Sequence, residues 1–241
     1  LSELFDLQDR IATRIVWSIA PHIQEAELQR ARRKRPENLS AYDLVLQSID
    51  LLYRMNHDDF MRAGELLNRA IAADERYPVS YAYAALWQIH RINQGWEDDH
   101  QSDSGEALRL AETGVALDPT DGFCLAVLGH ARSLLLRDYE AGIEVFDRAL
   151  LAAPSNAIVW TLSSGVFSYA GQAGAAITRA EMGLRLSPID KQSFFYLAFL
   201  SLAHYSNGTY EEAVTWARKS INMNPRLCSS QRWLIASLVA L

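Results

Sequence analysis

Apolar positions recur along this chain in blocks that each end at a proline. Each block is an alanine-rich stretch whose apolar residues follow a helical period, and the blocks end at Pro119, Pro154, Pro188 and Pro225. These prolines are 35, 34 and 37 residues apart. Proline lacks a backbone N–H and disfavours a helical residue before it, so each one marks the end of a helix. The pattern predicts a helical unit that repeats about every 34 residues.

Large and small residues take fixed places within each unit. A large residue lies six positions after the proline, or after the residue in its place, at Tyr42, Tyr81, Leu125, Trp160 and Phe194. A small residue follows four positions later at Ala85, Gly129, Ser164 and Ala198, although Leu46 departs from the rule. Twelve positions before the end of each unit stand Ala63, Ala107, Gly142, Ala176 and Ala213, and five positions before it stand Ala70, Gly114, Ala149, Gly183 and Ser220. Small residues allow the two helices of a unit to approach closely, and the large residue fills the space to the next unit.

Helix pairs with these positions resemble the tetratricopeptide (TPR) repeat, a helix–turn–helix unit. The resemblance implies an all-α fold, a right-handed α-α superhelix in which units stack because none can bury its apolar face alone. We assign residues 1–36 to N-terminal linker helices and residues 37–241 to the TPR array. The units are expected at about 37–75, 76–119, 120–154, 155–188 and 189–225, with a partial unit at 226–241. If Trp160 is buried, its truncation to alanine should cost about 3–5 kcal/mol.

The N-terminal segment carries a separate apolar stripe with helical spacing. Its members are Leu4, Leu7, Ile11, Ile15, Ile19 and Ile23. Asp6 suits an N-cap, and Pro21 predicts a kink or a junction of two helices. The stripe must be covered by the first repeat, by a second copy of the chain or by an upstream domain. Since residue 1 is Leu and not Met, we expect the chain to be part of a longer protein.

Composition narrows the classes of function. The formal net charge is −6, so no global field draws the chain toward nucleic acid or anionic membrane. The longest apolar run, 194–203, has about ten residues where a membrane-spanning helix needs about 20. Two cysteines, Cys124 and Cys228, offer no disulfide framework, which favours a reducing, cytoplasmic compartment. Both are expected to be buried small hydrophobes near the starts of helices.

Two clusters combine acidic residues with histidine. One is His57–Asp59, and the other is Glu97–His100 with Asp103; both are expected in insertions between the helices of a unit. Such side chains could hold a divalent metal, but neither cluster has EF-hand order or a HExxH helix, so solvated loop charges are the favoured interpretation. The basic run Arg30–Arg35 is either a solvated helix end or a contact to nucleic acid or phosphate, and the first is favoured. We therefore predict no catalytic residue, no metal and no cofactor.

The inner surface of a solenoid is its usual binding face. In TPR proteins the ligand-facing positions are the second, fifth, ninth and twelfth of the first helix. The candidate partner-binding residues at or beside these positions are Asp43, Gln47, Leu86, Phe123, His130, Thr161, Tyr169, Phe195 and Phe199. They lack the Lys and Asn set that grips a terminal carboxylate in chaperone-binding TPR proteins. The surface suits an amphipathic helix, an extended segment or the protein's own terminus, although the same residues could equally be core between stacked helices.

A more specific resemblance spans essentially all 241 residues and is carried by four stretches. The stretches Glu3–Ala12, Ile19–Pro21 and Arg32–Leu44, with Asn93–Trp96, resemble the C-terminal half of a group of bacterial signalling proteins. In that group a class III adenylate/guanylate cyclase domain or a winged-helix DNA-binding domain precedes a TolB-like segment and TPR repeats. The resemblance implies a protein or peptide partner, or another domain of the same chain. A further possibility is a homodimer through the N-terminal helices, from Leu4 to Ile23, which would match the dimeric habit of class III cyclases. The charge and hydropathy of the chain, and not the resemblance, predict no nucleic-acid and no membrane partner. No metal-binding aspartate of a cyclase can be placed on this chain.

Two functions follow from the sequence. The first is a non-catalytic TPR interaction scaffold, the C-terminal part of an adenylate cyclase-type protein. The alternative is a ligand- or metal-binding solenoid, or an enzyme, with its site in the insertion at 93–105.

Overall fold

A computed structural model of the chain describes residues 40–187 and 190–241. These residues form helices and connecting turns, without a strand. The helices are α2 (Ala41–Leu52), α3 (His57–Ala73), α4 (Pro78–Gln94), α5 (His100–Leu117), α6 (Gly122–Ala131) with a π-helical turn η2 (Arg132–Leu136), α7 (Tyr139–Ala152), α8 (Ala157–Tyr169), α9 (Ala173–Leu186), α10 (Ser193–Ser206), α11 (Tyr210–Met223) and α12 (Cys228–Ala240). The predicted linker helices at 1–36, the basic run Arg30–Arg35 and Pro188 lie outside the described residues.

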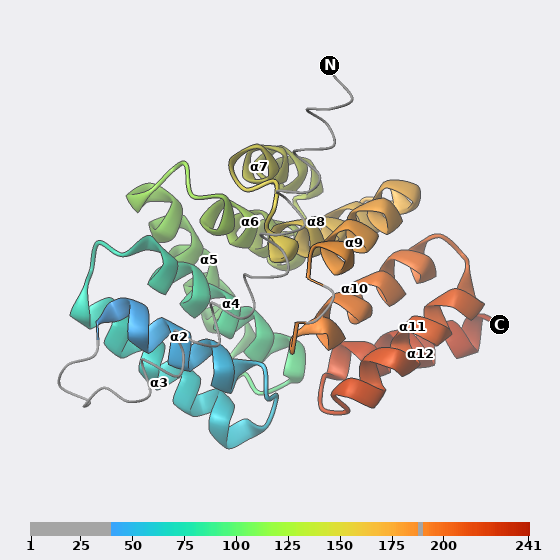
Figure 1. Cartoon of the computed structure of the whole chain (residues 1–241), viewed down its shortest axis with the longest axis horizontal. Helices are drawn as coiled ribbons and strands as arrows, with labels where there is room; N and C mark the ends of the chain where they lie inside the picture. Colours follow the sequence, from blue (N-terminus) through green and yellow to red (C-terminus); the bar gives the residue numbers. More distant parts are fainter. Residues whose placement is uncertain (1–39, 188–189) are drawn as a thin grey trace, which may run out of the picture.

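Consecutive helices form stacked pairs. We call α2, α4, α6, α8, α10 and α12 the A helices and α3, α5, α7, α9 and α11 the B helices. Each A helix up to α10 packs on the B helix that follows it and on the next A helix. The A helices line the inside of the arch and the B helices lie around its outside (Figure 1). The predicted all-α superhelix of helix pairs is confirmed.

Short polar residues and prolines set the ends of these helices. Six helices begin after a residue whose side-chain oxygen accepts a hydrogen bond from a backbone N–H of the first turn: Ser40, Asn56, Asp99, Asp121, Asp138 and Asn156. This bond satisfies a donor that has no partner within the helix. The B helices α5, α7 and α11 end two residues before Pro119, Pro154 and Pro225. The proline pattern therefore located these helix ends correctly.

The large position of the repeat has a different role from the one expected. The Trp160 indole N–H donates to the carbonyl of Pro154 at 2.8 Å, and the Tyr81 hydroxyl donates to the carbonyl of Glu75 at 3.1 Å. Both bonds reach back six residues to the turn between units, which lies at the surface. Trp160 is only half-buried, so the condition for the cost of truncating a buried tryptophan is not met. Where the position is apolar, as at Leu125 and Phe194, the side chain is buried.

One arginine links three consecutive helices. Arg179 of α9 lies 3.8 Å from the ring centre of Phe167 on α8, and its Nη2 is 3.5 Å from Asp147 Oδ1 on α7. Burial lowers the pKa of Arg179, and the carboxylate of Asp147 opposes that shift. The arginine thus joins the third and fourth pairs on the outer side.

The last helix returns to the first two pairs. Gln94, at the end of α4, donates from Nε2 to the carbonyl of Arg226 at 2.8 Å and accepts from the backbone N–H of Cys228 at 2.9 Å. Asn224 Nδ2 donates to the carbonyl of Tyr53 at 3.2 Å. We call these three hydrogen bonds the closure. Because of the closure, α12 contacts α4 as well as α10 and α11, so the array is nearly a ring.

Candidate functional site

Aromatic side chains from four A helices or their ends meet on the inner face of the array. Tyr53 follows α2, His90 belongs to α4, His130 to α6, and Phe195 and Phe199 to α10; we call these five residues the aromatic cluster. The ring centres of Phe195 lie 5.9 Å from Tyr53, 5.2 Å from His90 and 5.0 Å from Phe199. His130 is 6.0 Å from Phe199. Edge-to-face pairs at these separations are favourable for aromatic rings.

The cluster exists because α8 has no side chain at Gly165. A Cβ at Gly165 would lie 2.7 Å from the Phe199 ring, which is closer than real Cβ contacts. The ring therefore occupies space that any other residue at this position would take. The sequence brings α8 and α10 together here with a glycine on one helix and a phenylalanine on the other.

The cluster is largely buried but contains polar atoms that are not satisfied. Tyr53, His90, His130 and Phe195 are at most 6% exposed, and Phe199 is half-buried. The Tyr53 hydroxyl, His90 Nε2 and His130 Nδ1 have no hydrogen-bond partner among the described residues. Burying such a group without a partner costs about 1–3 kcal/mol. Three such groups lie in this one cluster, and each needs a hydrogen-bonding group, such as a water molecule or a ligand atom, to satisfy it.

The polar groups of the cluster are uncharged near neutral pH. Burial lowers the pKa of His130 to about 4. Burial, followed by the charge of His130, lowers the pKa of His90 to about 3. Burial also raises the pKa of the Tyr53 hydroxyl. Each neutral imidazole offers one N–H donor and one acceptor, so the cluster matches uncharged amide or hydroxyl groups.

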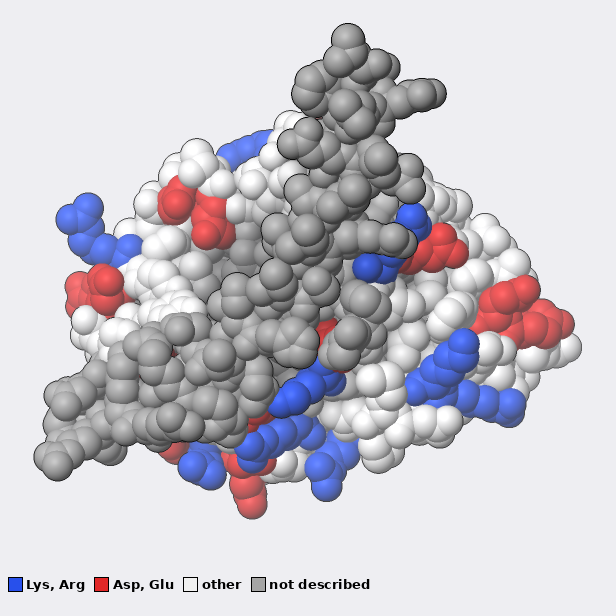
Figure 2. All heavy atoms as spheres, viewed as in Figure 1, with Lys and Arg blue, Asp and Glu red and all other residues white. Residues whose placement is uncertain are grey.

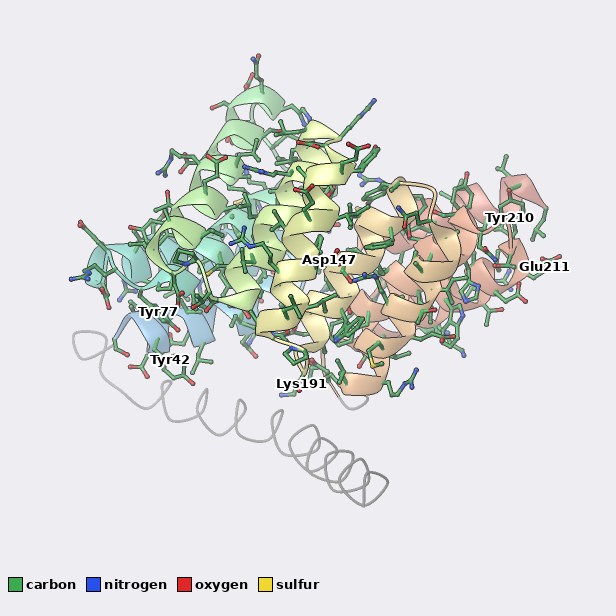
Figure 3. The ribbon with its side chains drawn as sticks, turned by 90° about the horizontal axis from the view of Figure 1, so that it is seen from above. Tyr42, Tyr77, Asp147, Lys191, Tyr210 and Glu211 are labelled. Carbon is green, nitrogen blue, oxygen red and sulfur yellow. The ribbon has the colours of Figure 1, made fainter. Side chains whose placement is uncertain are left out.

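Charge at the rim of the inner face is mixed. Figure 2 shows acidic and basic side chains interspersed around the edge of this face. Tyr42 and Tyr77 lie near one another at the starts of α2 and α4 (Figure 3), and Tyr42 is 41% exposed. This rim offers no broad field of one sign, and the inner face presents apolar and neutral polar groups.

The structure does not bring the predicted partner-binding residues together at one place. His130, Phe195 and Phe199 belong to the aromatic cluster. Phe123 packs against Tyr83 with ring centres 4.6 Å apart, Gln47 is half-buried on α2, and Leu86 is fully buried in the core. Tyr169 pairs with Tyr139 of the neighbouring B helix at 6.3 Å.

Two of the predicted residues have local structural roles. Asp43 is buried, and its Oδ2 accepts from the backbone N–H of Ser40 at 3.0 Å and from its hydroxyl at 2.7 Å, which closes the capping box of α2. Thr161 faces its own B helix, because a Cβ on Gly183 of α9 would lie 2.2 Å from its hydroxyl oxygen. It belongs to the contact between α8 and α9 and not to the inner face.

Sequence reasoning missed Tyr53 and His90. His90 lies one position beyond the twelfth residue of α4, and Tyr53 lies just beyond the end of α2. Both therefore fall outside the fixed ligand-facing positions of the repeat. The signal that could have found them is an aromatic residue near the end of each of the first two A helices.

The acidic segment at 93–105 is organised by an arginine. Arg91 donates to the carbonyl of Trp96 at 3.0 Å, to Asp103 Oδ1 at 3.3 Å and to the carboxylate of Asp98. Gly95 ends α4 with φ of +72°, a conformation that favours glycine, so that the chain can turn toward Arg91. The guanidinium lies between the carboxylates that a cation would otherwise use. The described residues hold no group of three or more His, Cys, Asp or Glu arranged to bind a metal.

The other acidic cluster is not in a loop. His57–Asp59 form the first turn of α3, after the N-cap residue Asn56. Asp59 accepts from Asn56 Nδ2 at 2.7 Å and from Arg54 at 3.1 Å, and the first of these bonds is the largest cause of its lowered pKa. The expectation of an insertion loop here was wrong because the extra residues lengthen the helix. Acidic residues in the first turn stabilise a helix N-terminus.

The two cysteines differ in exposure. Cys124 is fully buried, as expected, and Cys228 is partly exposed at the start of α12. No helix of the described residues combines the length and apolar character that a membrane span requires.

Comparison with known proteins gives similarity to repeat proteins. No family model matches the chain. Small glutamine-rich tetratricopeptide repeat-containing protein 2 of Mycosarcoma maydis is 28% identical over 96 residues, which is 39% of this chain and 26% of that protein. The match thus spans about a quarter of the curated relative.

Solved structures share the arrangement of helices. TTC0263, a thermophilic TPR protein of Thermus thermophilus, has a TM-score of 0.61 and 18% identity over 83% of this chain and 100% of that one. The human IFIT1 dimer with m7Gppp-AAAA has a TM-score of 0.68 and 13% identity over 98% of this chain and 54% of that one. At these identities the similarity concerns the fold alone.

Proposed function

Because the chain is a TPR-type helical repeat protein, we propose that it is a non-catalytic scaffold that binds a segment of a protein partner on its inner face. The observation that carries the proposal is the aromatic cluster, where three buried polar atoms have no partner among the described residues. The expected ligand is an amphipathic helix or an extended peptide. It would place an apolar side chain against Phe195 and Phe199 and neutral polar groups toward His90, His130 and Tyr53.

The proposal is tested by selecting peptides of about 15 residues, a typical length for a recognition segment, against the whole chain. Selected peptides should bind at least tenfold more weakly to Phe199→Asp, because a carboxylate in the cluster is costly to desolvate. The matched control is Leu151→Asp on α7, since Leu151 is 84% exposed. Circular dichroism would establish that both variants are folded. Equal loss of binding in the two variants, or no loss in either, would overturn the proposal.

The alternative function at 93–105 is less well supported. The Arg91 guanidinium already pairs with Asp98 and Asp103, and a divalent cation would have to displace it. Calorimetric titration with Mg²⁺, Ca²⁺, Zn²⁺, ATP and GTP separates the two functions. The scaffold predicts no heat of binding from any of them, and turnover of ATP by the chain would contradict it.

We also propose that the parent protein is a bacterial, cytoplasmic signalling protein of the adenylate cyclase type. Its support is the resemblance of Glu3–Ala12 and Arg32–Leu44 to the segments that precede TPR repeats in that group. The residues encoded immediately before Leu1 provide the test. A class III cyclase domain there would support the proposal, and an unrelated domain would end it.

A further inference from the structure

We propose that the chain's own N-terminal segment docks on its inner face, with the apolar stripe from Leu4 to Ile23 lying against the aromatic cluster. The segment lies outside the described residues, and the inference rests on its sequence and on the described surface. It goes beyond the proposed function because the docking requires no partner.

The stripe needs an apolar surface. Its six Leu and Ile residues are spaced by three or four positions, and the five that precede Pro21 occupy one side of a helix. Asp6, Asp9 and Arg10 fall on the opposite side of the same helix, and the uncharged Gln8 and Ser18 fall among the apolar residues. Covering a Leu or Ile side chain is worth about 1.5–3 kcal/mol, so a stripe of this length strongly favours docking over exposure to water.

The inner face offers the matching chemistry. The half-buried Phe199 and the ring of Phe195 provide apolar contact. The Tyr53 hydroxyl, His90 Nε2 and His130 Nδ1 require neutral hydrogen-bonding groups. A segment with leucine and isoleucine on one side, joined by the uncharged Gln8 and Ser18, and with Asp6, Asp9 and Arg10 on the other side meets both requirements. Arg14 falls at the edge of the apolar side, where a long side chain can keep its charge in water.

The tether is long enough to reach the cluster. The described chain begins at Ser40, the N-cap of α2, and Tyr53 follows the other end of that helix. A helix of this length spans about 20 Å. The residues between Ile23 and Ser40 can extend over about 55 Å, or about 25 Å if helical. The segment therefore reaches the cluster within one chain, where tethering gives an effective concentration in the millimolar range.

Photo-crosslinking in the full-length chain tests the docking. A benzophenone amino acid replaces Ile15 at the centre of the stripe, and the product is digested with trypsin. We expect intramolecular cross-links to the peptides 192–218, 77–91, 110–132 or 35–54, at residues of α10, α4, α6 or α2 that lie in or beside the aromatic cluster, and tandem mass spectrometry locates the linked residue. The same probe at Asp9, on the charged side, is the control and should give at most a tenth of this yield.

Two further measurements show whether the cross-link forms within one chain and whether it depends on Phe199. Mixing ¹⁴N- and ¹⁵N-labelled chains distinguishes cross-links within a chain from those between chains; cross-links between chains would overturn the proposal in favour of a dimer. Phe199→Glu should reduce the cross-link at least tenfold, and Phe199→Ala serves the same purpose if the first variant fails to fold. Cross-links to peptides of the outer helices, such as 63–69 or 180–185, would equally overturn it. No peptide ligand is added, so failure here leaves the partner-binding result independent.

Discussion

Gly183 on α9 lies against the first turn of α8 with no side chain between the two helices. A Cβ at this position would be 2.2 Å from Thr161 Oγ1, 3.1 Å from the carbonyl oxygen of Ala157 and 3.2 Å from the backbone N of Thr161. Two of these atoms belong to the backbone and cannot rotate away. The small residue five positions before the end of each unit therefore sets how closely a helix pair can pack.

Replacing this glycine should separate the pair. We expect Gly183→Ala to lower the free energy of unfolding by about 1–3 kcal/mol, the usual cost of overpacking. Gly174 lies in the same helix with no atom within 4 Å of its Cβ position, so Gly174→Ala should be neutral or stabilise by up to about 1 kcal/mol through helix propensity. Urea unfolding of both variants checks the prediction. A loss of stability in Gly174→Ala similar to that in Gly183→Ala would show that packing is not the cause.

The buried histidines should make stability depend on pH. Their pKa values are lowered by burial to about 3 at His90 and about 4 at His130, below that of an unfolded histidine near 6.5. The unfolded chain therefore binds protons that the folded chain rejects, and stability present above pH 6.5 is lost as the pH falls toward 4. Each histidine should cost about 1 kcal/mol by pH 5.5.

Urea titrations between pH 7.5 and 5.5 measure this loss before the carboxylates contribute. The double variant His90→Gln, His130→Gln should show a flatter dependence than the wild type. His57→Gln is the control, because the His57 side chain is 59% exposed. Identical slopes in the wild type and the double variant would mean that the cluster does not reject protons.

At the scale of helices, α12 depends on a residue of another repeat. It begins after Leu227 without a side-chain cap of its own, and Gln94 of α4 accepts the hydrogen bond from Cys228 N–H instead. Gln94 also holds the preceding turn through the carbonyl of Arg226. A helix end without such partners is destabilised by its unpaired backbone groups.

We expect Gln94→Ala to weaken the start of α12 by about 1–3 kcal/mol, since two hydrogen bonds are lost. Amide hydrogen exchange in the first turn of α12 should accelerate at least tenfold, which corresponds to about 1.4 kcal/mol. Gln101→Ala on α5, where the side chain is exposed, is the control. Unchanged exchange in Gln94→Ala would show that α12 does not need the cap.

The helix pairs could be predicted from the sequence because the residues that determine them lie within each pair or directly beside it. Pro119, Pro154 and Pro225 end the B helices, and Gly183 and its equivalents fix the close approach of each pair. Trp160 was misplaced because its polar N–H bonds to the turn, a choice that apolar size alone does not reveal. Only three of the predicted binding residues, His130, Phe195 and Phe199, meet in the aromatic cluster. Tyr53 and His90 join it because the superhelix curves back, which depends on small rotations summed over several repeats.

At the scale of the molecule, the closure changes how the repeats depend on one another. In an open solenoid each unit contacts only its neighbours, so a lesion in the last helix affects the adjacent helices alone. Here the bonds from Gln94 and to Tyr53 connect residues more than 130 positions apart. Disturbance at one end should therefore reach the other end directly.

Trp233→Ala tests this connection. Trp233 of α12 packs on Tyr205 of α10 with ring centres 5.7 Å apart, and its truncation should loosen α12. We expect faster amide exchange at the end of α4 as well as in α10 and α11. The extra effect on α4 should disappear in the background of Gln94→Ala. An effect confined to α10 and α11 in both backgrounds would describe an open array.

The three bonds of the closure also set the mechanical behaviour of the array. Tension applied between its ends would load Gln94 and Asn224 before any helix pair, because their hydrogen bonds span the gap between the first two pairs and the last helices. The closure should break first, at low force and with a small extension, and the helix pairs should then unfold one at a time. In a scaffold built in this way, force on an attached domain would break the hydrogen bonds of the closure before it unfolds any helix pair.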